Sequence, residues 1–180
     1  MRIFIAVELD ENLKGYIFDK QQTLKGYCEK GKFTSKENFH LTLKFIGQTN
    51  SNGIELLKEA IDKTAEKSSA FNLKLGKLGY FPKKNKKIMW LGISQGQNKL
   101  LQLFKVLENT LEEKGFERDT RGLNPHITLA REVTLNTYFD EICKEIKILD
   151  YNISVKKISL MESKRVDGEL KYIPIYAKEL

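Results

Sequence analysis

Two stretches of the sequence repeat each other: Phe39-His40-Leu41-Thr42-Leu43 and Pro125-His126-Ile127-Thr128-Leu129. Both contain His-apolar-Thr-Leu, and they hold the only two histidines of the chain. Side chains alternate between the two faces of a β-strand, so each histidine shares a face with its threonine while the apolar residues share the other. The sequence therefore predicts two matching strands, each with one polar and one apolar face.

The elements expected around these motifs follow the same order in both halves of the chain. Strands are expected over residues 3–8, 38–46, 71–80, 87–93, 125–131, 151–162 and 170–178, and helices over 11–29, 52–67, 98–114 and 136–147. No change of composition or flexible linker separates the halves. We therefore expect one α+β domain over 1–180 with an internal repeat of about 1–85 and 86–180. Its two similar lobes would be related by a pseudo-two-fold axis, each a mostly antiparallel sheet with helices packed outside, enclosing a central cleft.

Composition excludes several classes of protein. The chain has 180 residues, 41% of them hydrophobic, which is incompatible with a disordered chain. No apolar run approaches the roughly 20 residues of a membrane-spanning helix, and the first residues lack a signal-peptide cleavage site. Cys28 and Cys143 are far apart, which favours a reducing cytoplasm, and we expect a cytoplasmic monomer. Two histidines and two scattered cysteines offer almost no zinc ligands, so we expect neither metal nor cofactor.

The pairing of the motifs suggests a chemistry. If a pseudo-two-fold axis relates the halves, both polar faces converge on one cleft and place two imidazoles and two hydroxyls around one small group. A neutral imidazole can take a proton from water while an imidazolium protonates a leaving oxygen, since both titrate near neutral pH. Threonine hydroxyls can donate hydrogen bonds to the oxygens of a phosphate. A single His-x-Thr strand carries little information, but two copies that use every histidine favour phosphate chemistry.

Further segments accompany the two motifs. They are Arg2-Ile3-Phe4-Ile5-Ala6-Val7, Glu37 to Gly47, Leu75-Gly76-Lys77-Leu78-Gly79-Tyr80-Phe81-Pro82, Met89-Trp90-Leu91-Gly92, Pro125 to Arg131, and Glu162-Ser163 with Gly168 and Tyr172. With them, the chain resembles the 2H phosphoesterase superfamily, which is defined by two His-x-Thr/Ser motifs. Within it, the chain is similar to the RNA 2′,3′-cyclic phosphodiesterases, also called 2′-5′ RNA ligases.

The resemblance implies a hydrolase that opens the 2′,3′-cyclic phosphate at an RNA 3′ end and leaves a 2′-phosphate. It implies that His40 is the acid, that His126 is the base, and that Thr42 and Thr128 hold the phosphate. Ligation of RNA ends such as tRNA fragments, by the reverse chemistry, is a further implied activity. Two alternatives stay open: a non-catalytic RNA-binding module, and the same chemistry on another cyclic phosphate or a 2′-5′ linkage.

Two basic residues near the motifs are candidates for substrate contacts. Lys44 falls on the face of His40 and Thr42 in an ideal strand, where it either contacts the phosphate or is a solvated lysine. Arg131 falls on the face opposite Thr128, yet the resemblance implies a phosphate-binding arginine there. That role requires a bend or the end of the strand at this point; otherwise Arg131 is a surface arginine.

The net charge of +7 suggests a polyanionic partner, although a solvated basic surface is its commoner meaning. The basic turn Lys83-Lys84-Asn85-Lys86-Lys87 either is a solvated hairpin loop or attracts a nucleic-acid backbone. Nearby Tyr80 and Phe81 are candidates for stacking on bases, whereas Trp90 is expected in the core.

Overall fold

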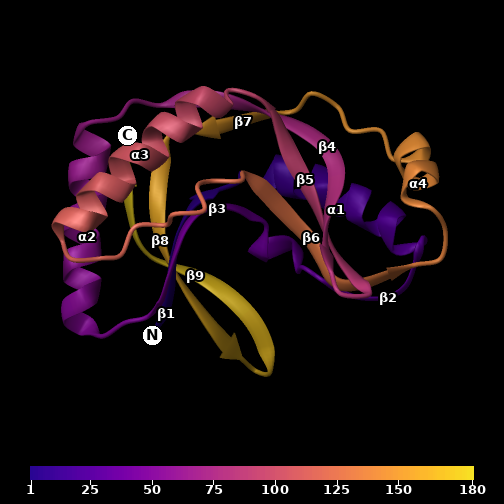
Figure 1. Cartoon of the computed structure of the whole chain (residues 1–180), viewed down its shortest axis with the longest axis horizontal. Coiled ribbons are helices and arrows are strands. Elements are labelled where there is room, and N and C mark those ends of the chain that lie inside the picture. Colours follow the sequence, from indigo (N-terminus) through magenta and orange to yellow (C-terminus); the bar gives the residue numbers. More distant parts are fainter.

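The computed structural model describes residues 1–180 (Figure 1). Its strands are β1 Arg2–Glu8, β2 Cys28–Phe33, β3 His40–Gln48, β4 Phe71–Lys83, β5 Lys86–Gln95, β6 His126–Leu135, β7 Asn152–Val155, β8 Lys157–Val166 and β9 Glu169–Glu179. The helices are α1 Glu11–Lys25, α2 Ser51–Glu66, α3 Gln97–Glu113 and α4 Phe139–Glu145, with a short 3-10 turn at Lys36–Asn38. No helix is long and apolar enough to cross a membrane.

Two antiparallel sheets form the frame. The first has the strand order β3-β1-β8-β9 and the second the order β2-β6-β5-β4-β7. This confirms the expected α+β class with two antiparallel sheets. Strands β3, β1 and β8 of the first sheet occupy the same relative positions as β6, β5 and β4 of the second. A motif strand, β3 or β6, lies at one side of each set of three. However, β8 comes from the second half of the chain and β4 from the first, so each sheet is completed by a strand from the opposite half.

Helices α1 and α3 illustrate the same exchange. Helix α1 follows β1 of the first sheet, but its Gln21 side chain donates hydrogen bonds to the carbonyls of Leu129 in β6, at 2.7 Å, and Thr34, at 2.8 Å. Helix α3 follows β5 of the second sheet and packs against α2, beside the first sheet (Figure 1). A continuous core of 34 buried apolar residues runs through both sheets. The repeated halves therefore interlock.

Several boundaries differ from the expected ones: the strand expected over 125–131 continues to Leu135, the helix expected over 136–147 spans only Phe139–Glu145, and two further differences change the set of strands. The predicted helix over 11–29 ends at Lys25, and Cys28–Phe33 forms the edge strand β2 instead. Half of the residues in this strand are charged and the strand is partly exposed, so it lacks apolar alternation and depends on pairing with β6. The predicted strand over 151–162 is divided at Lys156 into β7 and β8, which belong to different sheets.

A bulge in β3 changes which side chains share a face. Ile5 pairs with Lys44 and Ala6 with Thr42, so two steps along β3 match one step along β1. An extra residue of this kind breaks the alternation of faces. Lys44 is therefore buried on the core side, at 7% exposure, while Phe45 is 60% exposed.

The second motif strand has a bulge at the equivalent position. Met89 pairs with Ala130 and Trp90 with Thr128, so two steps along β6 match one along β5. Ala130 is fully buried, in the place equivalent to Lys44. Arg131 comes out on the opposite side and is exposed, like Phe45 in the first strand. This bulge supplies the bend that a role for Arg131 in the cleft requires.

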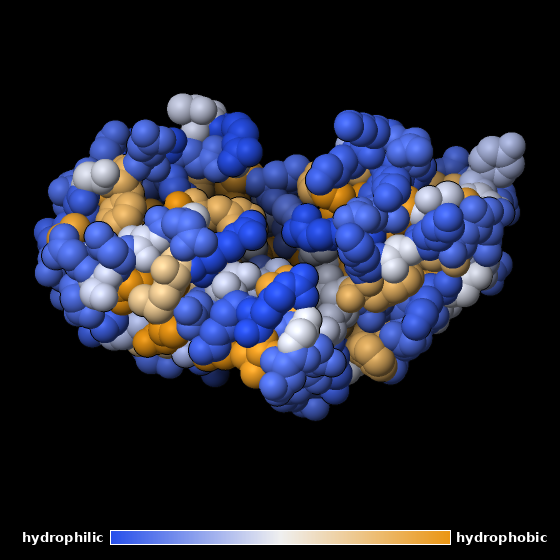
Figure 2. Space-filling model, turned by 90° about the horizontal axis from the view of Figure 1, so that it is seen from below, coloured by the Kyte–Doolittle hydropathy of each residue, from blue (hydrophilic) through white to orange (hydrophobic).

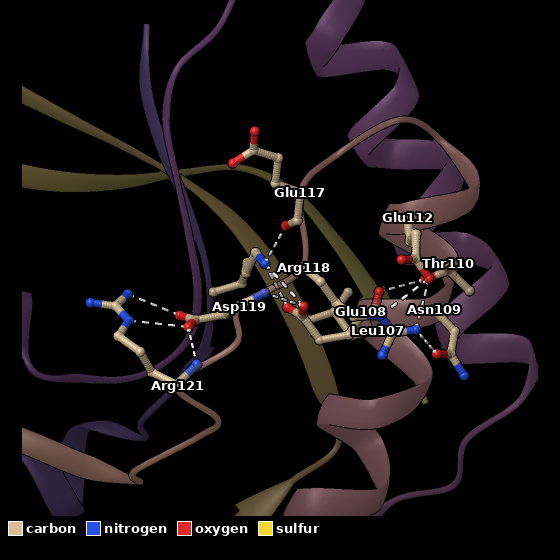
Figure 3. A network of polar contacts seen from close by, with 10 residues as sticks. Leu107, Glu108, Asn109, Thr110, Glu112, Glu117, Arg118, Asp119 and Arg121 are labelled. Atoms are coloured by element: carbon tan, nitrogen blue, oxygen red, sulfur yellow. Dashed lines mark hydrogen bonds and ion pairs between the residues drawn. The ribbon is translucent and has the colours of Figure 1, made fainter.

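The buried Lys44 binds a buried acid on α3. Its Nζ lies 2.8 Å from Oε1 of Glu108 and donates a hydrogen bond to Oε2 at 3.0 Å. It also donates to the Glu117 carbonyl at 2.7 Å, and Glu108 Oε2 accepts the Asp119 amide at 2.7 Å (Figure 3). These contacts fasten the connector 114–125, which leads into β6, to the edge strand β3.

Removing one charge of this pair leaves the other buried without a partner. We expect Lys44→Met to lower the free energy of unfolding by about 3–5 kcal/mol. The double variant Lys44→Met/Glu108→Met should recover most of that loss. Lys58→Met, which removes an exposed pair with Glu55 on α2, should cost less than about 1 kcal/mol. Urea unfolding of the four proteins measures this, and equal losses in the single and double variants would contradict it.

Candidate active site

A cavity of about 510 Å³ brings the two motifs together. Its lining includes His40 and Thr42 from β3, and His126, Thr128 and Arg131 from β6. The two motif strands belong to different sheets, so the cavity lies where the polar faces of the sheets meet. The space-filling view shows a hollow between the two lobes on the surface seen from below (Figure 2).

Both ring nitrogens of His40 make a hydrogen bond. Its Nδ1 lies 2.7 Å from the backbone carbonyl of Asn38. A carbonyl only accepts, so Nδ1 carries the proton and the neutral ring offers a lone pair at Nε2. The Thr42 hydroxyl lies 2.9 Å from that Nε2 and donates to it. The tautomer of His40 is thus fixed by its own segment, through Asn38 in the 3-10 turn before the strand and Thr42 within it.

Aromatic rings and the β8–β9 hairpin enclose His40. The rings of Phe4 and Tyr172 lie 4.9 and 5.1 Å from the imidazole, between centroids. The buried Asn38 side chain donates to the Leu170 carbonyl at 2.7 Å and accepts the Tyr172 amide at 3.0 Å. The residue that orients His40 through its backbone therefore also fixes the hairpin through its side chain.

His126 repeats this arrangement with one difference. Its Nδ1 lies 2.7 Å from the carbonyl of Asn124, again two residues earlier. Phe81 and Trp90 take the places beside the ring, at 5.0 and 6.4 Å between centroids. However, Thr128 makes no hydrogen bond to His126, so the Nε2 lone pair of His126 is free toward the cavity.

Burial and charge both act on the two histidines. Desolvation is the main cause that lowers the pKa of His40, to about 4, and the positive charge of Arg131 contributes. Burial likewise lowers the pKa of His126, again with a contribution from Arg131. In each case the hydrogen bond to the backbone carbonyl works in the opposite direction. Both shifts therefore favour the neutral imidazole in the free protein.

The two histidines and two threonines of the motifs were expected in the cleft from strand alternation. Arg131 was expected there from the resemblance. Lys44 is not among the lining residues: the prediction that it shares the face of His40 and Thr42 is wrong, and its side chain is buried rather than solvated. The bulge after Thr42 turns the lysine toward Glu108 and brings Phe45 into the cavity instead.

Sequence reasoning also missed part of the lining and misplaced the tryptophan. Arg2, Phe4 and Tyr172 line the cavity, and all three fall in the segments that carry the resemblance. Trp90 was expected in the core but is only half-buried, beside His126. Its ring occupies the space over Gly79, where a Cβ would come within 2.2 Å of it.

Comparison with known proteins shows the family of the chain. The family model described as "2′-5′ RNA ligase superfamily" matches residues 22–167. The chain belongs to this superfamily. Among its relatives, an RNA 2′,3′-cyclic phosphodiesterase of Methanocaldococcus jannaschii is 34% identical over 134 residues, which cover 73% of this chain and 71% of the relative. Another from Thermotoga maritima is 26% identical over 164 residues, covering 91% and 87%.

Solved structures share the fold of this superfamily member. Escherichia coli LigT complexed with 3′-AMP superposes with a TM-score of 0.82 at 24% identity, covering 99% of this chain and 97% of that one. TT0787 of Thermus thermophilus also has a TM-score of 0.82, at 21% identity, covering 100% and 98%. The agreement over the whole chain extends the likeness beyond the range that the family model matches.

The effect of Arg131 on the histidines can be measured directly, because the chain has only two histidines to assign. We expect Arg131→Gln to raise the pKa of both imidazoles toward 6.5 without reaching it, since burial remains. Arg118→Gln, which removes a surface arginine paired with Glu112, should leave both unchanged. NMR titration of the two imidazole Cε1–H signals measures this, and unshifted pKa values in Arg131→Gln would contradict it.

Proposed function

We propose that this protein hydrolyses the 2′,3′-cyclic phosphate at the 3′ end of RNA to a 2′-phosphate, without a metal ion. The observation that carries the proposal is the pair of imidazoles, each anchored at Nδ1 to the carbonyl two residues earlier, that line one cavity with two threonines and an arginine. The relatives named RNA 2′,3′-cyclic phosphodiesterase support the choice of substrate.

The proposed reaction needs two proton transfers. His126 Nε2 takes a proton from water as the water oxygen attacks phosphorus. The bond from phosphorus to O3′ breaks, and O3′ takes a proton from Nε2 of protonated His40. The products are a 2′-phosphate and a free 3′-hydroxyl, with the proton now on His126. A further proton transfer through solvent, from His126 to His40, restores the starting state. An RNA 5′-hydroxyl in place of water would give a 2′-5′ linkage by the same steps.

The surroundings of the two histidines support this division of roles. The free lone pair of His126 suits a base that must accept a proton from water. His40 needs a proton to act as the acid, and its pKa of about 4 in the free protein opposes this. A bound phosphodiester carries a negative charge, which stabilises the imidazolium and raises that pKa in the complex. Substrate binding therefore favours the protonated form of His40 that acts as the acid.

Other residues of the cavity suit the charge and the base of a nucleotide. Thr42, Thr128 and Arg131 are donors for the non-bridging phosphate oxygens, where negative charge grows in the transition state. Phe45 offers an exposed aromatic face for stacking on the terminal base. A non-catalytic RNA-binding module would need such contacts too, but it would not need two oriented imidazoles.

The roles of the histidines can be separated with two substrates. We expect His40→Ala and His126→Ala each to lose at least about 100-fold in kcat on a cyclic phosphate. An aryl phosphodiester has a leaving group that departs without a proton. It should restore much of the rate in His40→Ala and little in His126→Ala.

Circular dichroism and steady-state kinetics on both variants provide the control for folding and the measurement. Rescue of His126→Ala alone would reverse the two roles. More than a tenth of the wild-type turnover in either variant on the cyclic phosphate would exclude the paired-histidine mechanism.

Metal independence is tested by chelation. The cavity lining contains no aspartate, glutamate or cysteine, and the donors there favour an anion over a cation. We expect unchanged kcat and KM after dialysis against EDTA and in its presence. Loss of activity that added Mg²⁺, Mn²⁺ or Zn²⁺ restores would contradict the proposal.

A further inference from the structure

We propose that a strip of lysines on the second sheet binds the phosphate backbone of the RNA on the 5′ side of the cyclic phosphate. The lysine strip consists of Lys32, Lys83, Lys84 and Lys86, and it begins beside Arg131 at the cavity. The inference rests on the proposed function and extends it: the preferred substrate is a polynucleotide rather than a cyclic mononucleotide.

Strand register places the first lysine beside the cavity. Lys32 of β2 pairs with Arg131 of β6, and paired residues in neighbouring strands point to the same face of a sheet. Arg131 lines the cavity, so Lys32 lies next to it on the cavity face. The Lys32 side chain is 74% exposed.

The β4–β5 hairpin places the other lysines on the same face. Lys83 pairs with Lys86 next to the turn, and two residues further back Phe81 pairs with Ile88. The Phe81 ring lies against His126, so this set of pairs faces the cavity side. Lys84 is at the tip of the turn.

A single acid connects the two groups of lysines. Glu132 follows Arg131 in β6, which lies between β2 and β5. One of its oxygens lies 2.8 Å from Nζ of Lys32 and the other 3.5 Å from Nζ of Lys86. Those contacts lower the pKa of Glu132, with the hydrogen bond from Lys32 as the main cause. Lys83 and Lys84 have no ion pair, so the strip keeps a strong positive excess.

The position of the strip selects an RNA strand as its partner. A cyclic phosphate terminates the RNA at its 3′ end, so every further nucleotide lies on the 5′ side and must leave the cavity. The strip starts at a cavity residue and leads outward along the sheet. Lysines contact backbone phosphates without reading sequence, and their contribution decreases with salt.

The experiment compares two substrates that share the same reacting group. They are cytidine 2′,3′-cyclic phosphate and an eight-nucleotide single-stranded RNA that ends in the same cyclic phosphate. Lys83→Gln/Lys86→Gln removes two charges from the strip. Lys99→Gln/Lys105→Gln removes two exposed charges from α3 and is the matched control.

For the octanucleotide at low salt, we expect kcat/KM to fall about tenfold in the strip variant and to stay unchanged in the control. The slope of log kcat/KM against log salt should become shallower by about 1.4, since each single-strand phosphate contact contributes about 0.7. The mononucleotide should be hydrolysed equally by all three proteins.

A third variant should act in the opposite direction. Glu132→Gln frees Lys32 and Lys86 from their shared carboxylate, so kcat/KM for the octanucleotide should rise a few-fold while the mononucleotide is unaffected. Loss of folding cannot produce a gain limited to the longer substrate. Equal effects on both substrates, or an effect of the control as large as that of the strip variant, would overturn the proposal.

A binding measurement keeps this inference separate from the proposed function. Fluorescence anisotropy with a labelled octanucleotide that carries a 3′-phosphate requires no turnover. If the wild-type protein hydrolyses neither substrate but binds this RNA through the strip, only the proposed function fails. If it hydrolyses the mononucleotide but RNA binding is insensitive to the strip, only the inference fails. Strip-dependent binding of anionic phospholipid vesicles or polyglutamate, without RNA binding, also overturns it.

Discussion

The site depends on one hydrogen bond that occurs twice, from an imidazole Nδ1 to the backbone carbonyl two residues earlier in the chain. This bond fixes the tautomer and directs Nε2 away from the strand. Because both partners belong to one short segment, each motif orients its own histidine. The rest of the fold has only to bring two such segments together.

The exchange of strands between the halves does this. Each motif strand lies beside β1 or β5, and each of those is paired on its other side with a strand from the opposite half. The two sheets share a continuous core, so their polar faces cannot separate without disrupting it. Both halves of the chain are therefore needed to form the cavity. The buried ion pair of Lys44 and Glu108 adds a second connection. It links the edge strand β3 to the connector that leads into β6.

The sequence predicted what local alternation determines and missed what pairing determines. His40 and Thr42 share a face in any regular strand, so their place in the cavity could be inferred. The position of Lys44 depends on a bulge whose register is set against β1, and nothing within the strand itself indicates it. Strand β2 was missed because it has no apolar alternation. The exchange of β4 and β8 was missed because each half already contains enough strands for its own sheet.

If both imidazoles act on one phosphate, a single bound product analogue must affect both of them. A nucleoside 2′-phosphate added to the protein should raise the pKa of His40 and of His126 together, because its negative charge stabilises both imidazolium forms. Both NMR titrations should shift upward and saturate at one equivalent of ligand. A shift of only one histidine, or saturation at two equivalents with separate affinities, would show that the two motifs do not form a single site.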